Sequence, residues 1–268
     1  MSRVRVAAVQ MVSAAELAPN LDAAARLVAA AAAAGARLVA LPENFYCIGR
    51  AETDKLRLRE PEGRGPIQDF LAHVARKHGV WLVGGTAPLA CADERRIRSA
   101  CLVYDDAGKR VARYDKMHLF RFSSGDERYD EARTLEPGDR PVAVASPFGR
   151  LALSVCYDVR YPELYRALAP FEAMFVPSAF TVPTGAAHWE TLLRARAIEN
   201  QAYVIAPAQG GTHAGGRRTY GHSMIVDPWG EILAVQEEGE GVVLAEMDAE
   251  RIREVQAALP AHANRRMH

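Results

Sequence analysis

A cysteine at the junction of a strand and a helix is the first group in this chain that could do chemistry. Residues 150–163 read RLALSVCYDVRYPE, in which the apolar run Leu151–Val155 has the length of a buried strand and Cys156 follows it directly. Pro162 and Glu163 are typical of a first helical turn. A thiol placed there faces free backbone N–H groups, which lower its pKa and leave the sulfur open for reaction. The alternative is a small, inert core cysteine.

Two more ionisable residues also follow predicted strands. Glu43 comes after the strand Arg37–Leu41, and Lys116 comes after the strand Arg110–Tyr114. In layered α/β folds, functional sites gather at strand ends, so these side chains are candidates for the same site as the cysteine. Each has an alternative interpretation. Glu43 could form a structural salt bridge, because a buried carboxylate must be paired, and Lys116 could be a solvated surface lysine.

Together the three side chains supply what the hydrolysis of an amide needs. Cys156 as a thiolate would form a thioester acyl-enzyme. Glu43 would take the thiol proton, pass it to the departing amine and then deprotonate a water molecule. Lys116 and the backbone N–H of Tyr157 would stabilise the oxyanion. Histidine is the rival base, because His118 lies two residues beyond Lys116 and a Cys–His dyad is conceivable.

The composition sets the class of protein. The chain has 268 residues, 49% of them hydrophobic and 25% charged, which fits a single α/β domain over residues 1–268. We expect the tail beyond about 260 to be extended. With Lys+Arg 33 against Asp+Glu 33, charge gives no reason to expect nucleic acid or an anionic membrane as a partner.

Cysteine and histidine spacing argues against metals and disulfides. The four cysteines have no Cys-x-x-Cys spacing, and no histidine pattern resembles a metal site, so we expect no cofactor and no metal. The N-terminal segment does not resemble a signal peptide, and the alanine-rich run 20–35 is too short to cross a membrane and carries Asp22 and Arg26. We therefore expect a cytoplasmic protein.

Strands and helices alternate along the chain, with a polar loop expected over Ser123–Arg140. The predicted helices are Asn20–Ala34, Pro66–His78, a helix opening at Tyr161–Glu163, Trp189–Asn200 and Ala249–Ala258. The predicted strands, besides the three above, are Val4–Met11, Val80–Gly84, Ser99–Tyr104, Ala173–Pro177, Tyr203–Ala208, His222–Val226, Ile232–Val235 and Val242–Met247.

An ordered set of segments carries a family resemblance. LPEN, YDKMHLF, CYDVRYPE, PSAF, HWETLLRARAIEN and YGHSMIVDPWG resemble the nitrilase superfamily of carbon–nitrogen hydrolases, over nearly the whole chain. PSAFTVPTGAAHWE and YGHSMIVDPWG are similar to the branch that contains omega-amidases and deaminated glutathione amidases. The resemblance implies a four-layer α-β-β-α sandwich and a Glu–Lys–Cys triad, carried here by Glu43, Lys116 and Cys156. It also implies a second glutamate before an E-P-G-D turn, for which we take Glu131, with Glu127 and Asp130 as alternatives.

The resemblance further implies an amide on a small acid as the substrate. Deaminated glutathione is the first candidate, with alpha-ketoglutaramate, succinamate and N-carbamoyl amino acids as alternatives. A fixed guanidinium suits a carboxylate, and Arg160 is the nearest to the cysteine, unless it pairs with Glu163 or Asp158. Phe180 and Thr181 are expected to line the pocket. The loop residues Arg121, Arg217 and Arg218 could reach an extended substrate.

Two other function classes and an assembly complete the expectations. The same scaffold could be an inactive binding module, or an acyltransferase that passes the thioester to an amine. Retention of Glu43, Lys116 and Cys156 together argues against the first. The second would need a membrane span or a partner domain in its lipid or ammonia-using forms. Relatives pair through the helices after the nucleophile and after PSAF, here Glu163–Leu168 and Trp189–Asn200, so a homodimer or larger homo-oligomer is expected.

Overall fold

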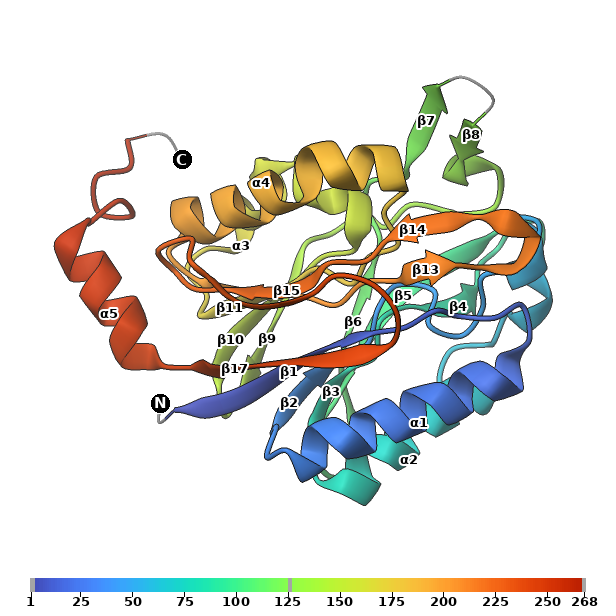
Figure 1. Ribbon diagram of the computed structural model, residues 1–268, viewed down its shortest axis with the longest axis horizontal. Coiled ribbons are helices and arrows are strands. Elements are labelled where there is room, and N and C mark those ends of the chain that lie inside the picture. Colours follow the sequence, from blue (N-terminus) through green and yellow to red (C-terminus); the bar gives the residue numbers. More distant parts are fainter. Residues whose placement is uncertain (1–2, 125–126, 267–268) are drawn as a thin grey trace.

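Two β-sheets lie face to face, with helices covering both outer faces (Figure 1). The computed structural model describes residues 3–124 and 127–266. Helices α1 (Leu17–Ala33) and α2 (Pro66–His78) cover one sheet, and α3 (Pro162–Leu168) and α4 (Val182–Asn200) cover the other. The predicted α-β-β-α sandwich is confirmed.

The first sheet has seven strands and mixed direction. Its order is β17-β1-β2-β3-β5-β4, with β6 paired to β5, and only the β1–β2 and β2–β3 pairs are parallel. The strands are β1 Val4–Gln10, β2 Leu38–Ala40, β3 Trp81–Val83, β4 Ala87–Ala90, β5 Ile97–Tyr104, β6 Arg110–Asp115 and β17 Gly241–Met247.

The second sheet has six strands in the order β16-β15-β12-β11-β10-β9. Its central pairs, β10–β11 and β11–β12, are parallel, and its other pairs are antiparallel. The strands are β9 Val142–Ser146, β10 Gly149–Leu153, β11 Ala173–Phe175, β12 Tyr203–Ala206, β15 Ser223–Val226 and β16 Ile232–Gln236. Each sheet therefore has parallel strands at its centre, whose carboxyl ends can gather functional side chains.

Strand β1 shows why the central strands read as continuous apolar runs. Val6 and Ala8 pack into the core between the sheets, whereas Ala7 and Val9 pack under α1 and α2. Successive side chains of a strand point to opposite faces, so a strand covered on both faces must be apolar at every position.

Of the five α-helices in the described residues, α2 and α5 (Ala249–Ala258) match their predicted bounds. Helix α1 begins three residues before the predicted Asn20. Helix α4 begins at Val182, seven residues before the predicted Trp189. The earlier start is possible because proline is tolerated in the first turn of a helix. Gly185 is needed in this part of α4 because a Cβ at this position would lie 2.3 Å from Cγ of Tyr220.

The structure has two short hairpins that the sequence did not indicate. Strands β7 (Arg121–Ser124) and β8 (Glu127–Asp130) form one, and β13 (Gly210–Thr212) and β14 (Arg218–Tyr220) form the other. The prediction of a polar loop over Ser123–Arg140 is therefore wrong in part, although its residues 125 and 126 lie outside the described residues. Figure 1 shows β7 and β8 projecting from the sandwich, where little apolar surface is buried and no alternating pattern is required.

The chain after α5 turns back towards the end of α4 instead of extending as predicted. Nε2 of His262 lies 2.8 Å from the carbonyl oxygen of Asn200, and the side chain of Gln201 donates to the carbonyl of Leu259. Across residues 3–124 and 127–266, no helix has the length and apolar character that a membrane span requires.

Candidate active site

Glu43 lies just beyond β2, in a short turn that is held at both of its ends. Its carbonyl accepts a hydrogen bond from Nε2 of Gln209 (3.1 Å), and the next N–H, that of Asn44, donates to Oγ1 of Thr86 (2.9 Å). Asn44 has a left-handed backbone with φ 55°, which asparagine tolerates better than most residues. The turn directs the Glu43 carboxylate into the protein, where the residue is 2% exposed.

Lys116 lies just beyond β6 and is also buried, with 1% of the residue exposed. Its ammonium contacts two carboxylates, at 2.8 Å from Oε1 of Glu43 and 2.8 Å from Oε2 of Glu131. The carbonyl of Lys116 accepts a hydrogen bond from the N–H of Gly138 (2.8 Å). Gly138 packs so closely that a Cβ there would lie 2.1 Å from the carbonyl oxygen of Asp115. Gly138 belongs to the E-P-G-D turn, so this turn fixes the backbone of Lys116. The lysine is therefore not a solvated surface residue.

Glu131 follows β8 and starts a 3-10 helix over Glu131–Arg133. Its N–H donates to the carbonyl of Phe120 (3.0 Å), and its carboxylate accepts from the N–H of Phe120 (2.7 Å). Of the three candidates for the second glutamate, this is the residue that the structure brings to Lys116. Asp130 forms no ion pair with Lys116 in the described part of the chain, and the Glu127 side chain lies outside it.

Cys156 lies three residues past the end of β10, at the start of a 3-10 helix over Cys156–Arg160. Its N–H donates to the carbonyl of Pro177 (2.9 Å), and its φ of 51° is in the left-handed region. A non-glycine residue held there carries a strain of about 1–3 kcal/mol, and such strain is common at active sites. The residue is 7% exposed and lines a pocket, so it is more than a core side chain.

Asp158 joins the cysteine turn to the lysine strand, a role that the sequence analysis missed. Its fully buried carboxylate accepts from the N–H of Val155 (2.8 Å) and the hydroxyl of Tyr114 (2.7 Å). It also accepts from the N–H of His118 (3.0 Å) and lies 2.7 Å from Nδ1 of His118. An aspartate three residues after the predicted apolar strand was the available signal, since a buried carboxylate must satisfy several donors.

The four residues expected to bind substrate line one pocket with Cys156. They are Tyr157, Arg160, Phe180 and Thr181, and Phe120 closes the same pocket. The guanidinium of Arg160 lies between the rings of Tyr157 (5.5 Å to the centroid) and Phe180 (5.4 Å).

Arg160 has one contact outside these rings and one unused donor. Its Nη1 lies 3.3 Å from Nδ1 of His188, and among the described residues it forms no ion pair with Glu163 or Asp158. Its Nε is buried without a hydrogen-bond partner in that part of the chain. The structural pairing considered for Arg160 is therefore not what holds it, and a donor remains for a ligand.

The electrostatics of the thiol differ from the prediction. Burial raises the pKa of Cys156 well above its ordinary value, and the charge of Glu43 raises it further. Lys116 and a hydrogen bond from the backbone of Ala179 lower it, but they do not outweigh burial. Burial alone would lower the pKa of Lys116, yet Glu131 and Glu43 raise it well above its usual range. The free site therefore holds a neutral thiol beside a charged lysine.

These shifts predict how alkylation of Cys156 depends on pH. Because the thiolate is the reacting species, the rate with iodoacetamide should rise about tenfold per pH unit from pH 6 to 9 without levelling off. An ordinary thiol levels off near a pKa of about 8.5. A Glu131→Gln variant loses one carboxylate that raises this pKa, so its curve should move to lower pH. Mass spectrometry of the Cys156 peptide measures the rate, and a plateau below pH 8 in the unmodified chain would contradict the expectation.

Fold and site together define a class of enzyme, and similarity to known proteins identifies it. Residues 5–257 match the family model for carbon–nitrogen hydrolases, so the chain belongs to this family and is a hydrolase of carbon–nitrogen bonds. The expected family and enzyme class are confirmed.

Individual relatives match over almost the whole chain. It is 43% identical to a deaminated glutathione amidase of Synechocystis sp., with 97% of each chain covered. It is 41% identical to the human deaminated glutathione amidase, with 97% of this chain and 82% of that protein covered. The crystal structure of Saccharomyces cerevisiae Nit3, a member of branch 10 of the nitrilase superfamily, matches with a TM-score of 0.88 and 33% identity, covering 99% of this chain and 97% of that one.

Proposed function

We propose that the protein hydrolyses an amide of a small carboxylate-bearing substrate, with deaminated glutathione as the first candidate. The observation that carries the chemistry is the buried ion-pair cluster of Glu43, Lys116 and Glu131, whose charges all act on the thiol of Cys156. The candidate substrate comes from the names of the relatives, which match the chain over nearly its full length.

In the proposed mechanism, Cys156 attacks the amide carbon while its proton passes to Glu43. The neutral thiol of the free enzyme makes this transfer necessary, because the nucleophile is the thiolate. Glu43 then protonates the departing nitrogen, the C–N bond breaks and a thioester remains. Water attacks the thioester as Glu43 takes its proton. The C–S bond then breaks, Glu43 returns that proton to the departing thiolate, and the free acid leaves.

The oxyanion of each tetrahedral intermediate would be stabilised by Lys116 and by the N–H of Tyr157. Lys116 directs N–H groups at Glu43 and Glu131 and keeps a third for substrate oxygen. Tyr157 lies in the first turn of its 3-10 helix, where N–H groups lack partners within the helix. Glu131 would hold Lys116 in place through the ion pair between them.

The alternative base, His118, is engaged elsewhere. Its Nδ1 lies 2.7 Å from Asp158, and its ring stacks on that of Tyr161 with centroids 3.7 Å apart. This arrangement favours Glu43 as the base. Normal turnover of a Glu43→Gln variant would instead favour the Cys–His dyad.

A substrate panel tests the proposed specificity. Purified protein should be assayed with deaminated glutathione, alpha-ketoglutaramate, succinamate and N-carbamoyl amino acids, and kcat/KM compared. We expect the highest value for deaminated glutathione, with Arg160 holding the carboxylate on the acyl side. A higher value for alpha-ketoglutaramate or succinamate would identify an omega-amidase, and a higher value for the carbamoyl compounds would identify an N-carbamoyl amino acid amidohydrolase.

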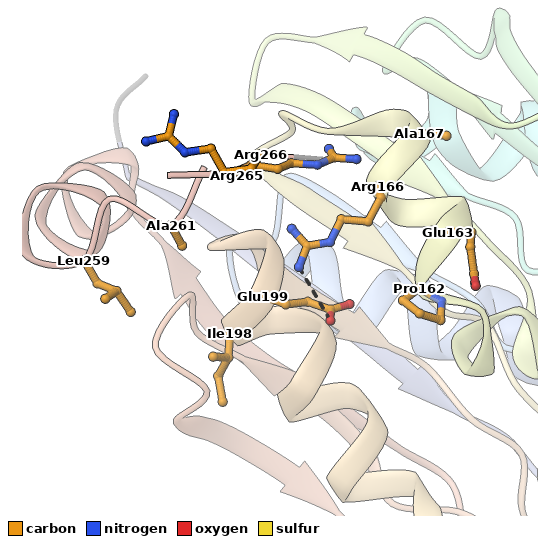
Figure 2. Close-up of a pocket in the computed structure, with 10 residues that line it drawn as sticks. All are labelled: Pro162, Glu163, Arg166, Ala167, Ile198, Glu199, Leu259, Ala261, Arg265 and Arg266. Atoms are coloured by element: carbon orange, nitrogen blue, oxygen red, sulfur yellow. Dashed lines mark ion pairs between the residues drawn. The ribbon is translucent and has the colours of Figure 1, made fainter. Parts of the chain in front are cut away.

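We also propose a homodimer that pairs through α3 and α4. A groove of about 1180 Å³ lies between these helices and the C-terminal segment. Figure 2 shows the Arg166–Glu199 ion pair between the helices, with Ile198 near it on α4 and Leu259 farther away on the C-terminal segment. Ile198 is 46% exposed and Leu259 47%, and both line this groove, so a second copy seated there would cover apolar side chains. Sedimentation of the purified protein tests this assembly, and a single species with the mass of one chain would contradict it.

We propose a reducing compartment, the cytoplasm, as the setting of the enzyme. All four cysteines, Cys47, Cys91, Cys101 and Cys156, are free thiols, which suits such a compartment.

A further inference from the structure

A second pocket, next to the Glu43 turn, has two cationic side chains and one carboxylate among its lining residues. Asn44, Glu52, Lys55 and Arg217 are among its lining residues. Nζ of Lys55 lies 2.9 Å from Oε2 of Glu52, and Nη1 of Arg217 lies 2.9 Å from Oε1 of the same carboxylate. Two cations thus share one carboxylate, so the pocket could bind a further anion.

Arg217 has contacts through its backbone and its guanidinium, and it also has an unused donor. Its carbonyl accepts from the N–H of His213 (2.8 Å), and its guanidinium lies over the ring of Tyr129, 5.3 Å from the centroid. Its Nε is buried and has no hydrogen-bond partner within residues 3–124 and 127–266. A buried donor left without a partner is costly, and a guanidinium fork matches a carboxylate in shape.

The pocket adjoins the proposed catalytic groups on the side of Glu43. Asn44, which lines it, directly follows Glu43 in the chain. Although burial raises the pKa of Glu52, the charges of Lys55, Arg217 and Lys116 lower it to about 2, so Lys116 lies within electrostatic reach.

A row of aromatic rings links this pocket to the one that contains Cys156. The ring of Tyr129, beneath Arg217, lies 5.8 Å from that of Phe120, and the ring of Phe120 lies 5.3 Å from that of Tyr157. Phe120 and Tyr157 line the cysteine pocket. The two arginines with unused Nε donors, Arg160 and Arg217, therefore lie at opposite ends of one aromatic wall.

The chemistry of the reaction determines which part of the substrate lies at each end of the aromatic wall. The acyl carbon of the substrate must bond to Cys156, whose pocket contains Arg160, whereas the leaving nitrogen must face Glu43 to receive its proton. We propose that Arg217, supported by Lys55, binds a carboxylate carried by the leaving amine of an extended amide substrate. This inference rests on the proposed function and adds that the substrate has carboxylates on both sides of the scissile bond, as deaminated glutathione does.

Removing one partner at a time, in the enzyme and in the substrate, tests the assignment. The substrate pair is deaminated glutathione and its analogue in which the glycine carboxylate is a neutral carboxamide. Loss of a charge-assisted hydrogen-bonded pair should lower kcat/KM of Arg217→Gln on the acid by about 10- to 100-fold, mainly through KM. On the carboxamide, the variant and the unmodified enzyme should have nearly equal kcat/KM, because the partner of Arg217 is already missing.

Two further variants separate binding from structure. Arg76→Gln removes the same charge from an exposed residue in the last turn of α2, away from both pockets, and should leave kcat/KM on the acid unchanged. Arg217→Lys keeps the charge without the planar fork and should recover part of the loss. Equal losses on both substrates, or no loss on the acid, would overturn the assignment while the amidase proposal stood. No cleavage of either substrate by the unmodified enzyme would instead overturn the choice of deaminated glutathione, and this inference with it.

Discussion

Replacing Cys156 by alanine should lower turnover on any amide substrate by at least about 10⁴-fold while the protein stays folded. The thioester cannot form without the sulfur, and the remaining groups have no nucleophile of comparable strength to direct at the amide. Folding should persist because alanine keeps the N–H that donates to Pro177 and removes only one atom from the pocket wall. Steady-state turnover and the midpoint of thermal unfolding are the two measurements.

A second buried cysteine supplies the matched control. Cys101 lies in β5 within the core between the sheets, so Cys101→Ala should keep activity but lose stability by about 1 kcal/mol through its small cavity. Opposite effects of the two substitutions would separate a reacting sulfur from a packing one. Activity in Cys156→Ala above about one percent of normal would exclude the proposed mechanism, since a lost nucleophile costs orders of magnitude more.

Replacing Lys116 by methionine should damage both catalysis and folding. The loss of an oxyanion donor should lower kcat by about 100- to 1000-fold. The carboxylates of Glu43 and Glu131 would lose the buried cation between them, and breaking a buried ion pair from one side costs about 3–5 kcal/mol. Denaturant unfolding and steady-state kinetics measure the two effects.

The stability loss should be partly reversible by a second substitution. Adding Glu131→Gln to Lys116→Met removes one of the uncompensated charges, so the double variant should unfold at higher denaturant than the single one. Lys77→Met, on the exposed side of α2, is the control for losing a surface lysine and should change stability by less than about 0.5 kcal/mol. A Lys116→Met protein as stable as the Lys77→Met protein would contradict the ion-pair account.

The sequence locates the candidate site well because strand ends can be seen in the pattern of apolar runs. Glu43, Lys116 and Cys156 each follow such a run, and the structure places each just past a strand of the sandwich. Helices α2 and α5 are predicted to the residue, because Gly79 in left-handed conformation ends the first and the Asp248 side chain caps the second.

What the sequence could not supply depends on contacts between distant segments. The pKa of Cys156 is set by burial and by charges that lie 113 and 25 residues away, at Glu43 and Glu131, which no local pattern contains. The β13–β14 hairpin, which carries Arg217 on its loop, is too short and too polar to show periodicity. Its position depends instead on the bridge between Thr181 and Thr219.

The two sheets divide the proposed catalytic groups between them. Glu43 and Lys116 come from β2 and β6 of one sheet, whereas Cys156 comes from β10 of the other. Neither sheet by itself holds a working set of groups, so hydrolysis requires the two sheets to stay packed against each other. The rate of hydrolysis therefore depends on the packing between the two sheets. A small separation of the sheets should abolish activity before the secondary structure unfolds.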